Sequence, residues 1–230
     1  MGASQQPVVR AYRSAHREAQ ARRTRQRVLR AATAVFLGRG YAGATMRAIA
    51  TEAAVSVPTV ESLFGTKARV LKAAIDVAIA GDDEPVPVLD RSWADAALGA
   101  ETVEELLWIA AGVLGSAQVR SAGLVLALLE ASPGDAELAE LSGQMLAQRA
   151  TTAAWLVDAL ARKAPLRAGC TREEAIDTVW VLMDPAVFDR LTRQRHWTLE
   201  RYQRWFAGSV RRLLIADSPP PPTISARSST

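Results

Sequence analysis

The chain has 230 residues, of which 49% are hydrophobic and 23% are charged, so it is long enough to bury a substantial core. A single cysteine, Cys170, excludes an intramolecular disulfide, and together with His16 and His196 it offers no cluster typical of a metal site. The chain has no run of eighteen apolar residues and no charged-then-apolar leader, so we expect a cytoplasmic protein with no membrane contact, and nothing in it indicates a cofactor.

The charge is unevenly distributed along the chain. Residues 1–80 contain 13 Lys and Arg against 4 Asp and Glu, a balance of +9, whereas residues 81–230 contain 15 against 20, a balance of −5. Attraction to phosphate is local, because each neutralised phosphate releases its own counterions. A basic first third followed by an acidic remainder therefore favours a protein that meets nucleic acid with one end only.

The first 43 residues predict an arm followed by one helix. Residues 1–20 are polar and lack a sustained apolar stripe, which predicts a flexible basic arm. From Arg22, apolar residues recur at helical spacing up to Gly38 and Gly40, where we expect the helix to end. The run 38–43 also fits G-x-G-x-x-G, but a helix precedes it in place of a strand, so a dinucleotide loop is rejected.

The stretch from Thr45 to Lys67 predicts two short helices joined by a tight turn. Thr45 can cap the first helix through its hydroxyl, and Ser56 can cap the second, with Pro58 in the first turn where a missing N–H costs nothing. Apolar residues recur on one face of each helix. This pattern is a helix-turn-helix. Its second helix presents an outward row of side chains that fits a major groove: Val57, Pro58, Thr59, Glu61 and Ser62.

The sequence resembles the TetR family of transcriptional regulators in this region. The resemblance rests on Val55-Ser56-x-x-Thr59-Val60 followed by Phe64-x-Thr66-Lys67-x-x-Val70-Leu71, with upstream matches at Phe36, Gly40-Tyr41, Thr45-Met46 and Ile49-Ala50, and it covers about residues 22–71. It implies DNA binding through the second helix, a first helix whose start approaches the DNA backbone, and a lysine that grips phosphate. The candidate DNA contacts are Arg22, Arg23, Arg25, Thr45, Ser56, Val57, Pro58, Thr59, Glu61, Ser62 and Lys67.

Two positions depart from the family pattern. Glu61 stands where the family usually has Tyr, and Leu63 where it has His or Tyr, and both family residues commonly reach phosphate. Glu61 could accept a hydrogen bond from a cytosine amino group, could repel the phosphates, or could pair with a basic neighbour on the helix surface.

Beyond Lys67 the pattern predicts helices throughout, so the expected fold class is all-α. A connecting helix runs to about residue 80, residues 81–100 are predicted as a loop and domain boundary, residues 101–217 form a larger helical domain, and the Pro-rich residues 218–230 are expected to be disordered. Thr102 and Thr171 each begin a capping box, while residues 122–129 are apolar on all sides and therefore central in the core.

The resemblance also implies what this second domain does. In the family the last two long helices form a dimer interface and the domain holds a small ligand whose binding releases DNA. The interface candidates are Trp180, Phe188, Trp205 and Leu213. The candidates for an apolar effector pocket are Trp108, Gln144, Met145, Gln148, Thr152, Trp155, Trp180 and Met183, with Trp93 as a further aromatic residue. The interface candidates could equally be packed core, and for each pocket candidate packed core is the more frequent role.

We therefore expect a homodimeric regulator of double-stranded DNA, a repressor of palindromic operators that responds to a small effector. One alternative is a helical interaction module that has kept the helix-turn-helix without reading DNA. A second alternative, a helical enzyme, has little support because the sequence shows no G-x-S-x-G, no phosphate loop after a strand and no metal cluster.

Overall fold

The computed structural model describes residues 6–216, with side-chain surroundings described from residue 17 onward. Within these residues the fold is all-α, as predicted, and the extended structure is limited to one antiparallel bridge between Leu166 and Ile215. The predicted Pro-rich tail, residues 218–230, lies outside the described residues.

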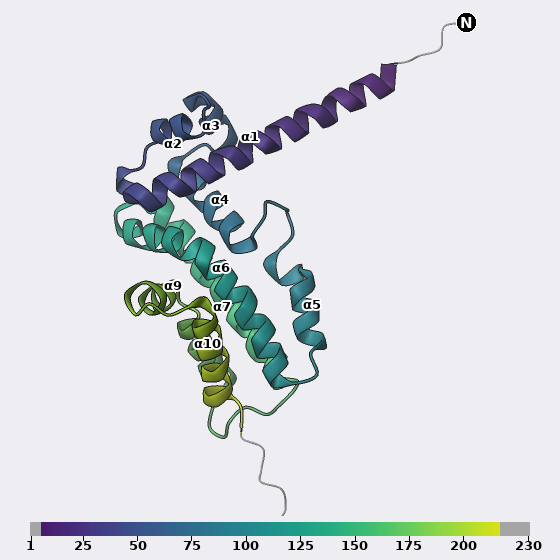
Figure 1. Cartoon of the computed structure of the whole chain (residues 1–230), viewed down its shortest axis with the longest axis vertical. Helices are drawn as coiled ribbons and strands as arrows, with labels where there is room; N and C mark the ends of the chain where they lie inside the picture. Colours follow the sequence, from purple (N-terminus) through teal and green to yellow (C-terminus); the bar gives the residue numbers. More distant parts are fainter. Residues whose placement is uncertain (1–5, 217–230) are drawn as a thin grey trace, which may run out of the picture.

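Helix α1 (Gln6–Gly43) is longer than predicted and extends well beyond the rest of the molecule (Figure 1). The basic arm predicted over residues 1–20 is helical from Gln6 onward, because this stretch is rich in Ala, Arg and Gln, which favour a helix even without a core to pack on. The break at the other end lies at Gly40, whose φ of 65° is left-handed, and the chain regains helical form up to Gly43.

Three short helices follow and pack against the second half of α1. They are α2 (Met46–Glu52), α3 (Val57–Phe64) and α4 (Lys67–Ala80), so the predicted helix-turn-helix and connecting helix are present. In Figure 1 α2 and α3 lie at one end of the molecule, and α4 leads from them towards the larger helical part.

The predicted linker 81–100 is only partly a loop. It contains the short 3-10 helix η1 (Val88–Asp90) and α5 (Ser92–Gly99). The acidic and proline residues at its start hid this helix, which buries Ala94 and Ala97 and packs beside α6.

Helix α6 (Val103–Ala131) is the centre of the larger part. It contacts α1, α4, α5, α7, α9 and α10, and its residues Ala122, Leu124, Val125 and Leu128 are buried, as predicted for the apolar run. This helix is long and apolar enough to cross a membrane by length and composition alone. Its place among six other helices is that of a core helix.

The remaining helices complete this part of the molecule. After η2 (Ser132–Gly134) come α7 (Ala136–Ala161), α8 (Arg172–Leu182), α9 (Pro185–Asp189), the π-helical turn η3 (Arg190–Gln194) and α10 (Leu199–Leu214). Thr171 makes its predicted capping box with Glu174. Thr102 caps α6, but the predicted box is incomplete because the Glu105 carboxylate accepts from the Glu101 N–H and not from that of Thr102. Asp184 caps α9 and Thr198 caps α10.

The core does not divide at the predicted domain boundary. One cluster of buried residues joins α1, α2, α3 and α4 to Leu124, Val125 and Leu128 of α6 and to Leu138 of α7. A second cluster joins α5, α6, α7, α8 and α10. The helix-turn-helix part is therefore packed directly on the C-terminal half of α6 and the N-terminal end of α7.

Candidate DNA-binding site and effector cavity

Local hydrogen bonds hold the two helices of the helix-turn-helix. The Thr45 hydroxyl oxygen accepts from the Ala48 N–H at 3.0 Å, and the Ser56 hydroxyl oxygen accepts from the Thr59 N–H at 3.2 Å. Each cap satisfies an N–H that a helix start leaves without a backbone partner. Both predicted caps are thus present, and the hydroxyls of Ser56 and Thr59 also lie 2.7 Å apart at the tip of α3.

The turn between α2 and α3 contains a non-glycine residue in left-handed conformation. Ala54 has φ of 50° and is exposed. An L-residue pays roughly 1–2 kcal/mol for this conformation, whereas glycine does not.

Ala54→Gly is therefore expected to raise the free energy of unfolding by up to about 1 kcal/mol, since the relief exceeds the roughly 0.4–1 kcal/mol of extra chain entropy that glycine loses. Chemical denaturation at fixed protein concentration measures this. Ala48→Gly, in the helical backbone of α2, is the matched control and should lower stability by about 1 kcal/mol. A loss of stability in Ala54→Gly would show that the turn is not strained.

The outward face of α3 carries the predicted row of side chains. Pro58, Glu61 and Ser62 are exposed, and Val57 and Thr59 are half-buried, while Val60 and Phe64 point into the core. Leu63 is half-buried and packs against the same core, which explains how the chain tolerates an apolar residue there. The structure thus leaves a polar row with one carboxylate, Glu61, on the surface of the second helix.

Lys67, a predicted phosphate contact, has partners within the chain. Its Nζ donates to the carbonyl oxygens of Tyr41 at 2.9 Å and Ala44 at 3.0 Å, and lies 3.9 Å from the centre of the Tyr41 ring. Burial lowers the pKa of Lys67, with an opposing contribution from Asp135. Two of the three ammonium N–H groups are therefore committed to the end of α1, a partnership that sequence spacing does not reveal.

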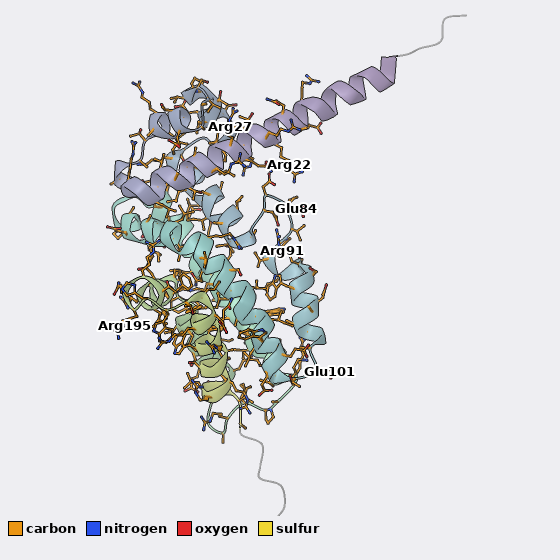
Figure 2. All side chains as sticks on the ribbon, in the orientation of Figure 1. Arg22, Arg27, Glu84, Arg91, Glu101 and Arg195 are labelled. Carbon is orange, nitrogen blue, oxygen red and sulfur yellow. The ribbon has the colours of Figure 1, made fainter. Side chains whose placement is uncertain are left out.

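The candidate arginines of α1 also differ from one another. Arg23 is exposed, Arg25 lies over the Phe64 ring with its guanidinium carbon 4.6 Å from the ring centre, and Arg22 donates to Asp83 at 3.4 Å. Asp83 also accepts from the Gln26 amide at 3.0 Å, and this bond is the main reason why the pKa of Asp83 is lowered. Arg22 and Gln26 thus attach the loop after α4 to α1, and Figure 2 shows Arg22 facing the loop that carries Glu84.

The same loop forms one wall of a cavity of about 750 Å³. Most of the other walls come from α4, α6 and α7, with single residues from α1, α5, α9 and α10. The lining is mostly apolar, with members such as Val77, Val86, Leu89, Val113, Leu114 and Trp155. Arg91 braces the loop by donating to both Asp82 oxygens at 2.6 and 2.8 Å, and these hydrogen bonds lower the pKa of Asp82 to about 2. This size and lining are typical of a small-molecule site.

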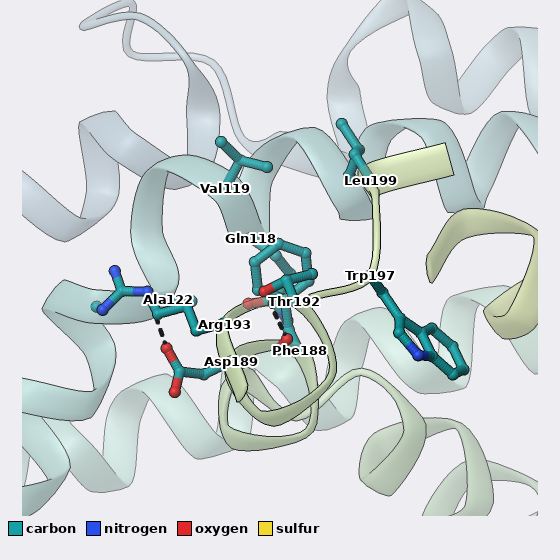
Figure 3. Close-up of a pocket in the computed structure, with 10 residues that line it drawn as sticks. Gln118, Val119, Ala122, Phe188, Asp189, Thr192, Arg193, Trp197 and Leu199 are labelled. Atoms are coloured by element: carbon teal, nitrogen blue, oxygen red, sulfur yellow. Dashed lines mark hydrogen bonds and ion pairs between the residues drawn. The ribbon is translucent and has the colours of Figure 1, made fainter. Parts of the chain in front are cut away.

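A smaller cavity of about 230 Å³ lies between α6, α9 and η3 (Figure 3). Asp189 and Arg193 form an ion pair at its rim, and Thr192 donates to the Phe188 carbonyl. Gln118 lines both cavities and donates to the Met183 carbonyl at 2.7 Å, so one buried amide lies between them.

Comparison with known proteins identifies the N-terminal part. The sequence profile described as bacterial regulatory proteins, tetR family, matches residues 28–74, which contain the whole helix-turn-helix. Residues 28–74 carry the helix-turn-helix domain of the TetR family. The match to the profile also places the chain among DNA-binding transcriptional regulators. No curated protein matches the sequence.

Solved structures show that the TetR likeness extends over most of the chain. A TetR-family regulator from Rhodococcus sp. has a TM-score of 0.62 at 15% identity, covering 83% of this chain and 98% of its own. FadR from Bacillus subtilis, in complex with stearoyl-CoA, has a TM-score of 0.64 at 16% identity over 80% and 96%. A regulator from Saccharomonospora viridis, in complex with choline, has a TM-score of 0.60 at 16% identity over 84% and 98%. At such identities these structures support the TetR fold.

The structure divides the predicted effector residues into two groups. Five line the large cavity, as does Trp93: Met145, Gln148, Thr152, Trp155 and Met183. Three do not. Trp108 is 49% exposed on α6, Gln144 bonds to Glu140 on the outer face of α7, and Trp180 lies behind Arg149. Helical spacing alone did not indicate which tryptophans face the large cavity.

The predicted interface residues are equally mixed. Phe188 is buried within the chain, edge to face with Tyr202 at 4.8 Å, so its assignment as an interface anchor is corrected. Trp205 packs against Tyr202, and Trp180 is covered by the Arg149 guanidinium 3.8 Å from its ring centre. Leu213 is 51% exposed on α10, and Val181, which the sequence did not single out, is 53% exposed on α8.

Proposed function

We propose that this TetR-family chain is a homodimeric transcriptional repressor of the cytoplasm that binds palindromic operators and is released by a small, largely apolar effector. The observation that carries this proposal is the sharing of α4 between the two sites. The N-terminus of α4 follows the helix-turn-helix directly, while its Ala73, Val77 and Ile79 line the large cavity. A molecule in the cavity therefore contacts the helix that directly follows the DNA-reading helix-turn-helix, called the reading head below.

Contacts of the loop support the same coupling. Asp83, which lines the cavity, is bonded to Gln26 and Arg22 of α1, on the stretch that carries the candidate phosphate contacts. An effector that binds more tightly to one conformation of this loop favours the arrangement of α1 and α4 that belongs to that conformation. Coupling between two binding sites is usually about 1–3 kcal/mol in such systems.

The outer faces of α8 and α10 support dimerisation. Glu173 and Asp177 are exposed on α8, and Arg201, Arg204 and Arg212 are exposed on α10, beside the exposed Val181 and Leu213. A two-fold axis that sets α8 of one subunit against α10 of the other would pair acidic with basic residues around apolar contacts. A dimer also supplies the two reading heads that an inverted repeat requires.

The test is selection of DNA duplexes of random sequence by the purified full chain at near-physiological salt, followed by sequencing of the retained pool. Enrichment of an inverted repeat is the expected result. A folded, dimeric protein that retains no sequence would favour the alternative, a helical interaction module, which the exposed Glu61 and the commitment of Lys67 to backbone carbonyls also favour.

A finer prediction concerns the basic start of α1. Replacing the exposed Arg23 with alanine is expected to lower the slope of log affinity against log salt by about 1 without changing sequence preference, because one phosphate contact and its released counterions are lost. Binding isotherms at four or five salt concentrations, on the selected duplex and on a scrambled one, measure both quantities. Arg162→Ala, at the exposed C-terminal end of α7, is the control and should keep the slope. An unchanged slope in Arg23→Ala would make Arg23 a solvated surface residue.

A further inference from the structure

Besides its acidic loop, Arg25 and Asp76, the large cavity has a strongly polar place on its wall where α7 and α8 meet. Arg149 of α7 lines the cavity, and its side chain is only 12% exposed. Its guanidinium lies flat over the Trp180 ring, 3.8 Å from the centre, and its Nη1 donates to the Asp184 Oδ2 at 2.8 Å. The position of the guanidinium is thus fixed from two sides.

Arg149 keeps a donor that this packing does not use. Its Nε is fully buried and has no hydrogen-bond partner in the described part of the chain. A buried guanidinium N–H without an acceptor is costly, and proteins normally satisfy such a group. Because this Nε has almost no accessible surface, a ligand oxygen reaches it only if the guanidinium shifts, and the part of Arg149 that already borders the cavity is what a ligand meets first.

Other polar groups of the cavity are already engaged or exposed. The hydroxyls of Ser121, Thr151 and Thr152 donate to carbonyls of their own helices, and the Gln118 amide donates to Met183. Gln148 is exposed near the cavity rim and can supply a second donor. Glu84 on the loop wall is an exposed acceptor, so it is the free polar capacity of the α6 and α7 wall that is mainly donor capacity.

The charges around the cavity favour the same kind of ligand. The carboxylates Asp82 and Asp83 on the loop wall are bonded to Arg91 and to Gln26 and Arg22. One Asp184 carboxylate oxygen accepts from Arg149 and the other accepts from the Ala186 N–H. Asp184 does not line the cavity. Asp76 also lines the cavity and is paired with Lys72, while Glu84 is an exposed carboxylate on the loop wall near Arg91. A cation placed at Arg149 would be repelled by the guanidinium, whose own carboxylate partner does not line the cavity.

We propose that the effector is a largely apolar molecule with one oxygen acceptor, a carboxylate or an ester-type carbonyl, which accepts a hydrogen bond from Arg149 while the apolar part packs on Trp155, Val113 and Leu114. The proposal rests on the effector function proposed above and names the chemistry of that site. An acyl chain with its carboxyl or carbonyl oxygen is the simplest member of this class. A quaternary ammonium ligand is not.

Direct binding to the purified full chain, without DNA, tests this. The probes are dodecanoate, methyl dodecanoate and dodecyltrimethylammonium, which share a chain and differ in the head, each below its micellar concentration and measured by calorimetry. We expect dodecanoate or its ester to bind at least ten-fold more tightly than the ammonium. Binding of dodecanoate alone would identify a carboxylate site, and binding of the ester alone would identify a carbonyl site.

The test variant is Arg149→Leu combined with Asp184→Asn, because leucine alone would leave the Asp184 carboxylate without its partner while asparagine can still cap α9. We expect this variant to lose about ten-fold or more in affinity for the oxygen-bearing probe, whereas Asp184→Asn alone and Arg162→Leu keep most of it. Equal binding by the double variant, tighter binding of the ammonium, or no binding of any probe would overturn the proposal. Because no DNA is present, these outcomes are independent of whether an operator is found.

Discussion

Leu128→Ala is expected to lower the free energy of unfolding by about 2–5 kcal/mol. Leu128 is completely buried on α6, in the cluster that also contains Leu71 and Ile75 of α4 and Phe36 of α1. Its removal leaves a hollow between the helix-turn-helix part and the central helix. The cost should lie towards the upper end of that range, because three helices would have to move to fill the space.

The two parts are expected to unfold together in this variant. All six tryptophans lie after residue 80, so tryptophan fluorescence follows the larger part while far-UV circular dichroism follows every helix. Both signals should shift to lower denaturant by the same amount at fixed protein concentration. Leu98→Ala, at a 38% exposed position on α5, is the control, with an expected change within about 0.5 kcal/mol. Two separate transitions, only one of them shifted, would contradict a shared core.

Lys67→Met is expected to cost about 1.5–3 kcal/mol of stability and to leave the salt dependence of DNA binding unchanged. The cost arises because the ammonium donates to the Tyr41 and Ala44 carbonyls where α1 ends, and hydrogen bonds to charged groups have about this value. The slope of log affinity against log salt should not change, because the Lys67 ammonium is bonded within the chain and neutralises no DNA phosphate. Affinity itself should fall, since the Tyr41–Ala44 segment leads directly into the Thr45 cap of α2.

Denaturation and binding at several salt concentrations separate the two roles of this lysine. Lys72→Met is the matched control on the same helix: Lys72 pairs with Asp76 one turn away, so the expected loss is only about 0.3–0.5 kcal/mol. If Lys67→Met instead kept its stability and lowered the salt slope by about 1, Lys67 would be a phosphate ligand, as its position in the family pattern suggests.

Whether a contact could be predicted depends on how far apart in the sequence the two bonded residues lie. The caps at Thr45, Ser56, Thr171, Asp184 and Thr198 were predictable because each joins a side chain to an N–H within three residues of it. The outward row of α3 followed from helical spacing. The role of Lys67 did not, because its partners lie 26 and 23 residues back in the chain.

In the larger part, the length of the helices limited how well the sequence could predict which way each side chain faces. Trp108 and Trp155 both lie on long helices with apolar residues on several sides, and only the packing of α5 and the 81–91 loop decides that Trp155 faces the cavity while Trp108 faces outward. Helix α5 was missed because five of its eight residues are Ser, Ala or Gly and its start has no side-chain cap, so its formation depends on burial of Ala94 and Ala97.

The sequence by itself therefore determined the helix-turn-helix, the all-α fold and most helix starts, since these depend on local hydrogen bonds and on the 3.6-residue period of apolar side chains. Only the tertiary structure decided that the reading head shares a core with α6, that α4 and the loop at Asp83 border the cavity, and that Arg149 is held there with an unused donor. Those features join residues far apart in the chain, and no periodicity along one helix can specify which neighbour it meets.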